Sequence, residues 1–214
     1  MSYKVKSSST KDDYVVEKHP FEPFLLDNTS YLVLGTFPTH ISNLCYNFYY
    51  SSKENNFWKI IEKVFNHSFV HHAEDKAVNE RQSFLKDNKI GVTDMHEVCY
   101  RRNKSSSDKD LYTIQLRNIF SILDRYPSIS RLILTSRTEV FGALGLLKTL
   151  FLQHEKPFPD ITRRSDKILE SKFIYAGSKI EIVVPYSPSP RLIADKVTTM
   201  EELITMYTFC LSLE

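Results

Sequence analysis

Two short stretches, GTFPT at residues 35–39 and SPSPR at residues 187–191, each follow an apolar run and carry residues suited to chemistry. In the first, Gly35 allows a sharp turn, and Pro38 restricts its own backbone and that of the preceding phenylalanine. Phe37 is therefore expected to be a rigidly held ring. Such a ring either stacks against a flat ligand or closes the end of the hydrophobic core.

Asp94 and Asn55 are polar side chains at the ends of predicted elements. Asp94 follows a second apolar run, where its carboxylate could stabilise a cation or orient a base, although an aspartate at a strand end often only caps a turn. Asn55 and its neighbour Asn56 precede a helical pattern that starts near Phe57. Because asparagine is a preferred helix N-cap, Asn55 either caps this helix or contacts a ligand, and the two roles are compatible.

Basic side chains follow two of the predicted elements. Arg101 and Arg102 lie in the charged, serine-rich stretch 99–110, which is predicted to be a loop, and Arg191 follows the sequence SPSP. Arginines in such loops are suited to phosphate contacts, and the alternative is an ordinary solvated surface. The formal net charge of +2 neither requires nor excludes a nucleic-acid partner.

Several common kinds of site are absent from the sequence. The five glycines form no phosphate-binding loop, and there is no GxSxG motif of serine hydrolases. His71 and His72 have no carboxylate or cysteine at metal-binding spacing, so neither a metal nor a cofactor is expected. Cys45, Cys99 and Cys210 are an odd, widely spaced set, which argues against disulfides and a zinc finger. With no signal peptide and no apolar run near the ~18 residues of a membrane span, we expect a cytoplasmic protein without membrane association.

Apolar periodicity predicts the elements that must position these residues. Strands are expected at 31–35, 89–95 and 131–136 and around a Gly-Ser turn within 172–185; helices are expected at 55–65, 76–87, 111–126, 139–153 and 194–212. This alternation predicts one three-layer α/β/α domain with a mostly parallel sheet over residues 14–214, after a disordered polar tail at residues 1–13. Ligands of such sheets bind outside the carboxyl ends of the strands, so the loops after the strands should share one cleft.

Five stretches, in this order, resemble the uracil-DNA glycosylase superfamily, and in particular its branch of hypoxanthine-DNA glycosylases and mismatch-specific glycosylase-like proteins. They are HPFEPF (19–24), GTFPTHIS (35–42), FYYSSKENNFW (48–58), GVTDMHEVCYRRNKSSSD (91–108) and SPSP (187–190). The resemblance covers roughly residues 19–205. It implies the same α/β fold with a central, mostly parallel sheet.

The resemblance also implies an activity. Members of this superfamily flip a damaged nucleotide out of DNA and hydrolyse the bond between its base and sugar, without a metal or cofactor. The expected partner is DNA that carries a deaminated base, namely uracil, hypoxanthine or xanthine, and the process is base-excision repair. Phe37 would then stack on the flipped base, and the other residues of the base pocket would be Gly35, Thr36, Pro38 and Asn56.

The predicted catalytic residues are Asn55 and Ser187, which the resemblance implies, and Asp94, which follows the second predicted strand. Asn55 would position a water or bond to the base edge, and Asp94 would stabilise the sugar cation. Ser187 stands where the family has a histidine that polarises the base, and Phe37 stands at the acidic position of the Asp-containing forms. Serine is a weaker electrophile, so activity is expected to be slow.

DNA contacts follow from the same alignment. Ser189 would contact base or phosphate, and Arg191 and Leu192 occupy the position of the wedge that enters the duplex. Arg101 and Arg102 would contact phosphates. The protein is expected to act as a monomer.

Two other functions fit the sequence. The missing first-motif acid and second-motif histidine are compatible with a nucleic-acid-binding module that kept the pocket and lost the chemistry. An α/β enzyme acting on free nucleosides would use the same cleft without salt-dependent DNA binding.

Overall fold

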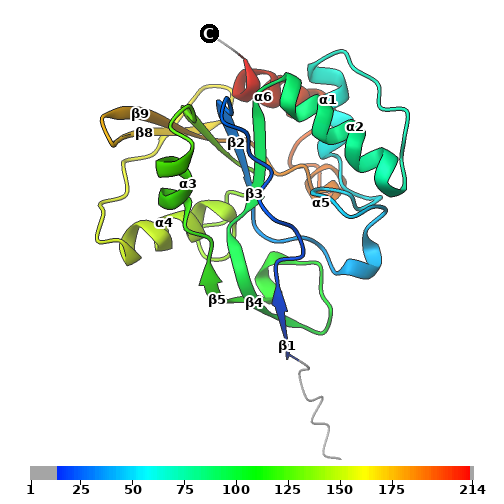
Figure 1. Ribbon diagram of the computed structural model, residues 1–214, viewed down its shortest axis with the longest axis horizontal. Helices are drawn as coiled ribbons and strands as arrows, with labels where there is room; N and C mark the ends of the chain where they lie inside the picture. The colour runs from blue at the N-terminus through cyan, green and yellow to red at the C-terminus, as the bar shows by residue number, and fades with distance from the viewer. Residues whose placement is uncertain (1–13, 213–214) are drawn as a thin grey trace, which may run out of the picture.

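The structure is a computed structural model that describes residues 14–212, which fold around a six-stranded sheet (Figure 1). The strand order is β3 (Ile90–Asp94), β2 (Tyr31–Gly35), β6 (Arg131–Leu134), β9 (Ser178–Val184), β8 (Leu169–Tyr175) and β7 (Thr162–Arg163). The first four strands are parallel, whereas β8 and β7 each run antiparallel to the preceding strand in this order. The predicted mostly parallel sheet is confirmed.

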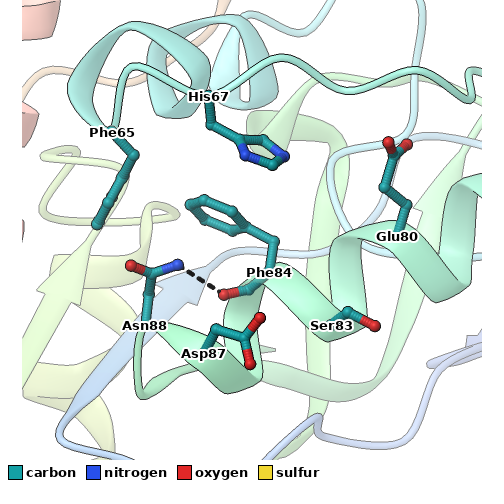
Figure 2. A pocket seen from close by; sticks show the side chains of 7 residues that line it. All are labelled: Phe65, His67, Glu80, Ser83, Phe84, Asp87 and Asn88. Atoms are coloured by element: carbon teal, nitrogen blue, oxygen red, sulfur yellow. Dashed lines mark hydrogen bonds between the residues drawn. The ribbon is translucent and has the colours of Figure 1, made fainter.

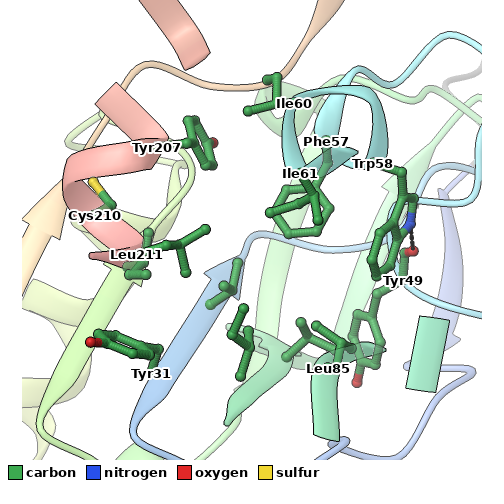
Figure 3. Packing of buried hydrophobic residues seen from close by; sticks show 14 of the residues in the cluster. Tyr31, Tyr49, Phe57, Trp58, Ile60, Ile61, Leu85, Tyr207, Cys210 and Leu211 are labelled. Atoms are coloured by element: carbon green, nitrogen blue, oxygen red, sulfur yellow. Dashed lines mark hydrogen bonds between the residues drawn. The ribbon is translucent and has the colours of Figure 1, made fainter. Parts of the chain in front are cut away.

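Helices cover both faces of this sheet (Figure 1). One face carries α1 (Phe57–Val64), α2 (Glu74–Asp87) and α6 (Met200–Leu211); the other carries α3 (Ile119–Arg125) and α4 (Ala143–Gln153). Successive residues of β2 point to opposite cores, Val33 to the first and Leu32 and Leu34 to the second. Figure 3 shows the first core, where Trp58 Nε1 donates a hydrogen bond to the carbonyl oxygen of Tyr49 at 3.0 Å. The three-layer α/β/α architecture is therefore as predicted.

A second, three-stranded sheet extends beyond the carboxyl ends of the parallel strands, at the bottom of Figure 1. It consists of β1 (Tyr14–Lys18), β4 (His96–Arg102) and β5 (Leu111–Leu116), with β4 in the centre. The predicted helix over 111–126 is wrong in its first half, because residues 111–116 pair with β4 and α3 starts only at Ile119. Residues 99–102 likewise belong to β4, so the predicted loop begins later.

The last predicted helix, 194–212, starts too early, because α6 begins only at Met200 and Ala194 belongs to a separate short helix. The short α5 (Pro190–Ala194) is followed by a turn, and α6 starts after Thr199, whose side chain forms a capping box with Glu202. The remaining helical turns are η1 (Ile41–Asn43) and η2 (Asp108–Asp110). The predicted tail at residues 1–13 lies outside the described residues. Between residues 14 and 212, no helix is both long and apolar enough to cross a lipid bilayer.

Candidate active site

One cleft of about 1030 Å³ opens where β2, β3, β6 and β9 end. Its walls are formed by the loops that follow β2, β6 and β9, by Asp94 at the end of β3, and by residues 50–55 and 105–108. The chain places these loops side by side because the four parallel strands all end at the same edge of the sheet. The prediction that the loops share one cleft is confirmed.

A smaller hollow of about 480 Å³ lies between the end of α1 and α2, away from this edge (Figure 2). Two of its polar side chains, Glu80 and Asn88, already have structural partners. The carboxylate of Glu80 accepts hydrogen bonds from the amides of Val70 and His71 at 2.7 and 2.9 Å, and Asn88 Nδ2 donates to the carbonyl oxygen of Phe84 at 2.8 Å. The larger cleft is therefore the better candidate for a catalytic site.

Phe37 lines the large cleft and is held by buried neighbours. The rings of His19 and His96 approach it edge-on, with centroid distances of 5.2 and 6.1 Å. The guanidinium carbon of Arg101 lies 5.3 Å from the ring centroid, and Nη2 of Arg101 donates to the carbonyl oxygen of Pro38 at 2.7 Å. Phe37 itself is half-buried. Its ring is thus fixed in the wall while part of it remains open to a ligand.

The burial of Arg101 contradicts its predicted contact with DNA phosphate. This side chain is 1% exposed, its Nε donates to the carboxylate of Glu17 at 2.9 Å, and its Nη1 donates to the carbonyl oxygen of Ser105. Arg101 therefore holds β1, the 37–38 turn and the serine-rich loop together. Arg102 points to the surface instead, with 40% of its side chain exposed and Asp110 Oδ1 at 4.0 Å.

Asp94 ends β3 directly beside Gly35 in the sheet register. Its side chain is almost fully buried yet lines the cleft, and its Oδ2 forms a hydrogen bond of 3.0 Å with Nε2 of His19. A Cβ added at Gly35 would lie 2.1 Å from Oδ1 of Asp94. Gly35 has no left-handed backbone angle, so this glycine is required for the space that the carboxylate occupies rather than for a sharp turn.

Asn55 caps α1 and also lines the cleft. Its Oδ1 accepts a hydrogen bond of 2.8 Å from the amide of Phe57 in the first turn of α1, and the half-buried side chain also lines the cleft. Asn56 is buried, and its amide donates to the carbonyl oxygen of Pro188 at 3.1 Å. The backbone amide of Asn56 therefore connects the start of α1 to the second motif loop, and Asn56 does not line the cleft, so its predicted base contact is not supported.

The second motif loop forms the opposite rim. Ser187 and Ser189 both line the cleft, and Ser187 Oγ accepts a hydrogen bond of 3.2 Å from the amide of Ser189. Arg191 is exposed and Leu192 half-buried, in α5 at the cleft mouth. The cleft therefore combines a polar loop with a basic and an apolar side chain at its edge.

Two residues that sequence reasoning did not propose complete the site. His19 is the partner of Asp94, and Asp108 lines the cleft with its Oδ2 accepting a hydrogen bond of 3.0 Å from Thr36 Oγ1. Burial, together with the nearby Asp94 carboxylate, raises the pKa of the Asp108 carboxyl to about 6. Both residues lie within stretches that resemble the glycosylase branch, His19 in HPFEPF and Asp108 at the end of 91–108. Their place in these stretches is the signal from which the sequence could have identified both residues.

Two other titratable groups near the cleft, His96 and Tyr50, are neutral at pH 7. Burial lowers the pKa of His96 to about 4, and burial raises the pKa of the Tyr50 hydroxyl well above its usual value. The Tyr50 hydroxyl lies 3.2 Å from Thr135 Oγ1. Within residues 14–212, no cluster of histidine, cysteine, aspartate and glutamate side chains is arranged to hold a metal ion.

Comparison with known proteins gives one partial similarity. The chain is 29% identical to a hypoxanthine DNA glycosylase of Methanosarcina acetivorans over 90 residues, which are 42% of this chain and 54% of that relative. The matched segment thus spans about half the length of the relative. No protein-family profile matches the chain. The similarity indicates a distant, DNA glycosylase-like relationship.

Proposed function

We propose that this protein is a monofunctional DNA glycosylase that hydrolyses the bond between a deaminated base and its deoxyribose. The observation that carries the proposal is the meeting of Phe37, Asn55, Asp94 and Ser187 in one cleft, in a chain with a distant hypoxanthine DNA glycosylase relative. The substrate is DNA with a flipped-out uracil, hypoxanthine or xanthine, and the protein acts as a monomer in base-excision repair.

The chemistry needs an aromatic surface for the base and an anion for the sugar. A base extruded from DNA loses its stacking, and one aromatic contact restores about 1–3 kcal/mol. Phe37 offers this surface at little entropic cost because its neighbours already fix the ring. As the glycosidic bond breaks, positive charge grows on the sugar, and the carboxylate of Asp94 stabilises it at the closed end of the cleft.

The remaining residues position the water and the DNA. The amide of Asn55 holds the attacking water, since its Oδ1 is fixed by the Phe57 amide. The Ser187 hydroxyl donates to the departing base. Arg191 and Leu192 at the cleft mouth enter the space left by the flipped nucleotide, and Arg102 contacts a phosphate.

A panel of labelled oligonucleotides tests this proposal. Single strands and duplexes that carry one uracil, hypoxanthine, xanthine or mismatched thymine are incubated with the protein and then treated with hot alkali, which cleaves abasic sites. We expect cleavage at one of the deaminated bases and none in the undamaged strand. If no lesion is cleaved at high enzyme and long times, the glycosylase proposal is wrong, and tight binding to abasic DNA would instead favour a non-catalytic binding module.

Substitutions at Asn55 separate its two roles. Asn55→Ala should lower the single-turnover rate of base release about 10²–10³-fold by removing a positioned dipole, and should lower the free energy of unfolding by about 1 kcal/mol by removing the cap. Asn55→Ser keeps a capping oxygen, so stability should recover while the rate stays low. Denaturant melts and rapid-quench assays measure the two quantities. A wild-type rate in Asn55→Ser would show that the Asn55 side chain caps α1 and takes no part in the reaction.

A further inference from the structure

Asp108 is a carboxyl group in the cleft to which the proposed function has given no role. It stands in η2, at the end of the serine-rich loop, and lines the same cleft as Asp94 and Phe37. Thr36 Oγ1 donates a hydrogen bond to its Oδ2 at 3.0 Å, and the nearby Ser136 hydroxyl also favours the ionised carboxyl. These hydroxyls come from the loops after β2 and β6, so the carboxyl lies where the ends of these strands meet.

The charged and titratable groups that face Asp108 differ from those that face Asp94. Asp94 on β3 repels the Asp108 carboxylate, Arg101 on β4 attracts it from a buried position, and the Tyr50 hydroxyl is neutral. Asp94 has the imidazole of His19 as a hydrogen-bond partner, while Asp108 has neutral hydroxyls. Two carboxyl groups in different surroundings of one site commonly divide the acid and anion roles between them.

We propose that Asp108 is a catalytic general acid that protonates the departing base, and that the substrates are therefore deaminated purines. This inference rests on the proposed glycosylase function. Purines present a basic ring nitrogen, N7, which accepts a proton before the base departs. The sequence lacks the histidine of the second motif, and Ser187 is a weak proton donor. Asp108 supplies the missing donor from a different loop.

The step balances as a hydrolysis. The bond between C1′ and N9 breaks with its electron pair moving to the base, and the Asp108 carboxyl transfers its proton to N7. The oxygen of the bound water forms the new bond to C1′, and one water proton passes to the Asp94 carboxylate. The products are a neutral purine and an abasic sugar with a C1′ hydroxyl. Solvent then returns a proton to Asp108 and removes one from Asp94.

Rates of base release from a hypoxanthine duplex between pH 5 and 9 test the assignment. The reaction requires the protonated acid, so the rate of the wild-type protein should be highest below the pKa of about 6 and fall as the pH rises. Asp108→Asn should react about 10²-fold more slowly at pH 6 and lose this pH dependence. Asp110→Asn removes a carboxylate from the same turn and should keep the shape of the wild-type profile.

A second substrate and a second variant exclude a purely structural role. Hypoxanthine methylated at N7 departs without protonation, so Asp108→Asn should match the wild-type rate on it; an equal loss on both substrates would overturn the proposal. Thr36→Val removes a hydrogen bond that favours the ionised carboxyl, which raises its pKa and should move the fall in rate to higher pH. This shift can be measured even if Asp108→Asn is unstable.

The outcomes separate the two proposals. If the wild-type protein releases no base from any lesion, the glycosylase function is wrong and the acid role of Asp108 is wrong with it. If the wild-type protein is active while Asp108→Asn retains its rate and pH profile, only the acid role is wrong. A protein that releases uracil and no deaminated purine would contradict both the assigned substrate class and the transfer of a proton from Asp108 to purine N7.

Discussion

Replacing Asp94 with asparagine is expected to lower the single-turnover rate of base release about 10³-fold while leaving binding to abasic DNA nearly unchanged. The carboxylate lies at the closed end of the cleft, where little water screens its charge. It acts on the sugar cation only as the bond breaks, so its removal should lower the rate of the chemical step rather than affinity. Asparagine has nearly the same shape and can still bond to His19.

The control for this variant is Asp87→Asn, which removes a carboxylate from the hollow beside α2 (Figure 2). That variant should react at the wild-type rate. Rapid-quench assays with excess enzyme measure the chemical step, and thermal melts check that both variants are folded. A wild-type rate in a folded Asp94→Asn would show that the carboxylate takes no part in the reaction.

Replacing Gly35 with alanine is expected to reduce activity nearly as strongly as the Asp94 substitution. The new Cβ would lie 2.1 Å from Oδ1 of Asp94 and 3.0 Å from the Tyr50 hydroxyl, so the carboxylate must move. A shift of about 1 Å in a catalytic group commonly costs about 10²-fold in rate. Moving a buried carboxylate away from His19 should also lower the free energy of unfolding.

Gly177→Ala separates the loss of activity from the loss of stability. Gly177 has a φ of +82°, and a Cβ there would meet no atom within 4 Å. Alanine at this position should therefore cost about 1 kcal/mol of stability through backbone strain alone, without a change in the rate. If Gly35→Ala and Gly177→Ala lose stability equally and both remain active, Gly35 has no special role beside Asp94.

The parallel sheet and the cleft could be predicted from sequence because the strands that form them are strong local signals. The buried runs at 31–35 and 180–184 are continuously apolar over most of their length, and the order of strands and helices then determines where their loops meet. The fold class depends on the alternation of strands and helices along the chain. It is therefore confirmed, although several predicted element boundaries differ from those of the structure.

The errors arose where pairing between distant segments decides the structure. Leu111 and Ile114 have helical spacing, yet residues 111–116 form a strand because β4 supplies the backbone partners. The start of α6 was visible in principle, since Thr199 and Glu202 have the spacing of a capping box. The amphipathic pattern continues through the turn before Thr199, so the predicted helix began at residue 194 instead.

The site residues also divide into those with a local sequence signal, which were predicted, and those that depend on distant partners, which were missed. Phe37, Asn55, Asp94 and Ser187 were proposed because each follows a recognisable element or motif, and all four line the cleft. His19 and Asp108 were missed because their partners Asp94 and Thr36 lie 75 and 72 positions away in the chain. Arg101 was misassigned for the same reason: its charge is visible in the sequence, and its burial against Glu17 and Phe37 is not.

The most direct test of the proposed activity is a mass measurement on a duplex that carries a single hypoxanthine, incubated with the wild-type protein and with Asp94→Asn. Hydrolysis replaces the base with a hydroxyl group, so we expect an abasic strand and free hypoxanthine in equal amounts with the wild-type protein and almost none with Asp94→Asn. Intact strands with both folded proteins, repeated for duplexes that carry uracil and xanthine, would contradict the glycosylase function.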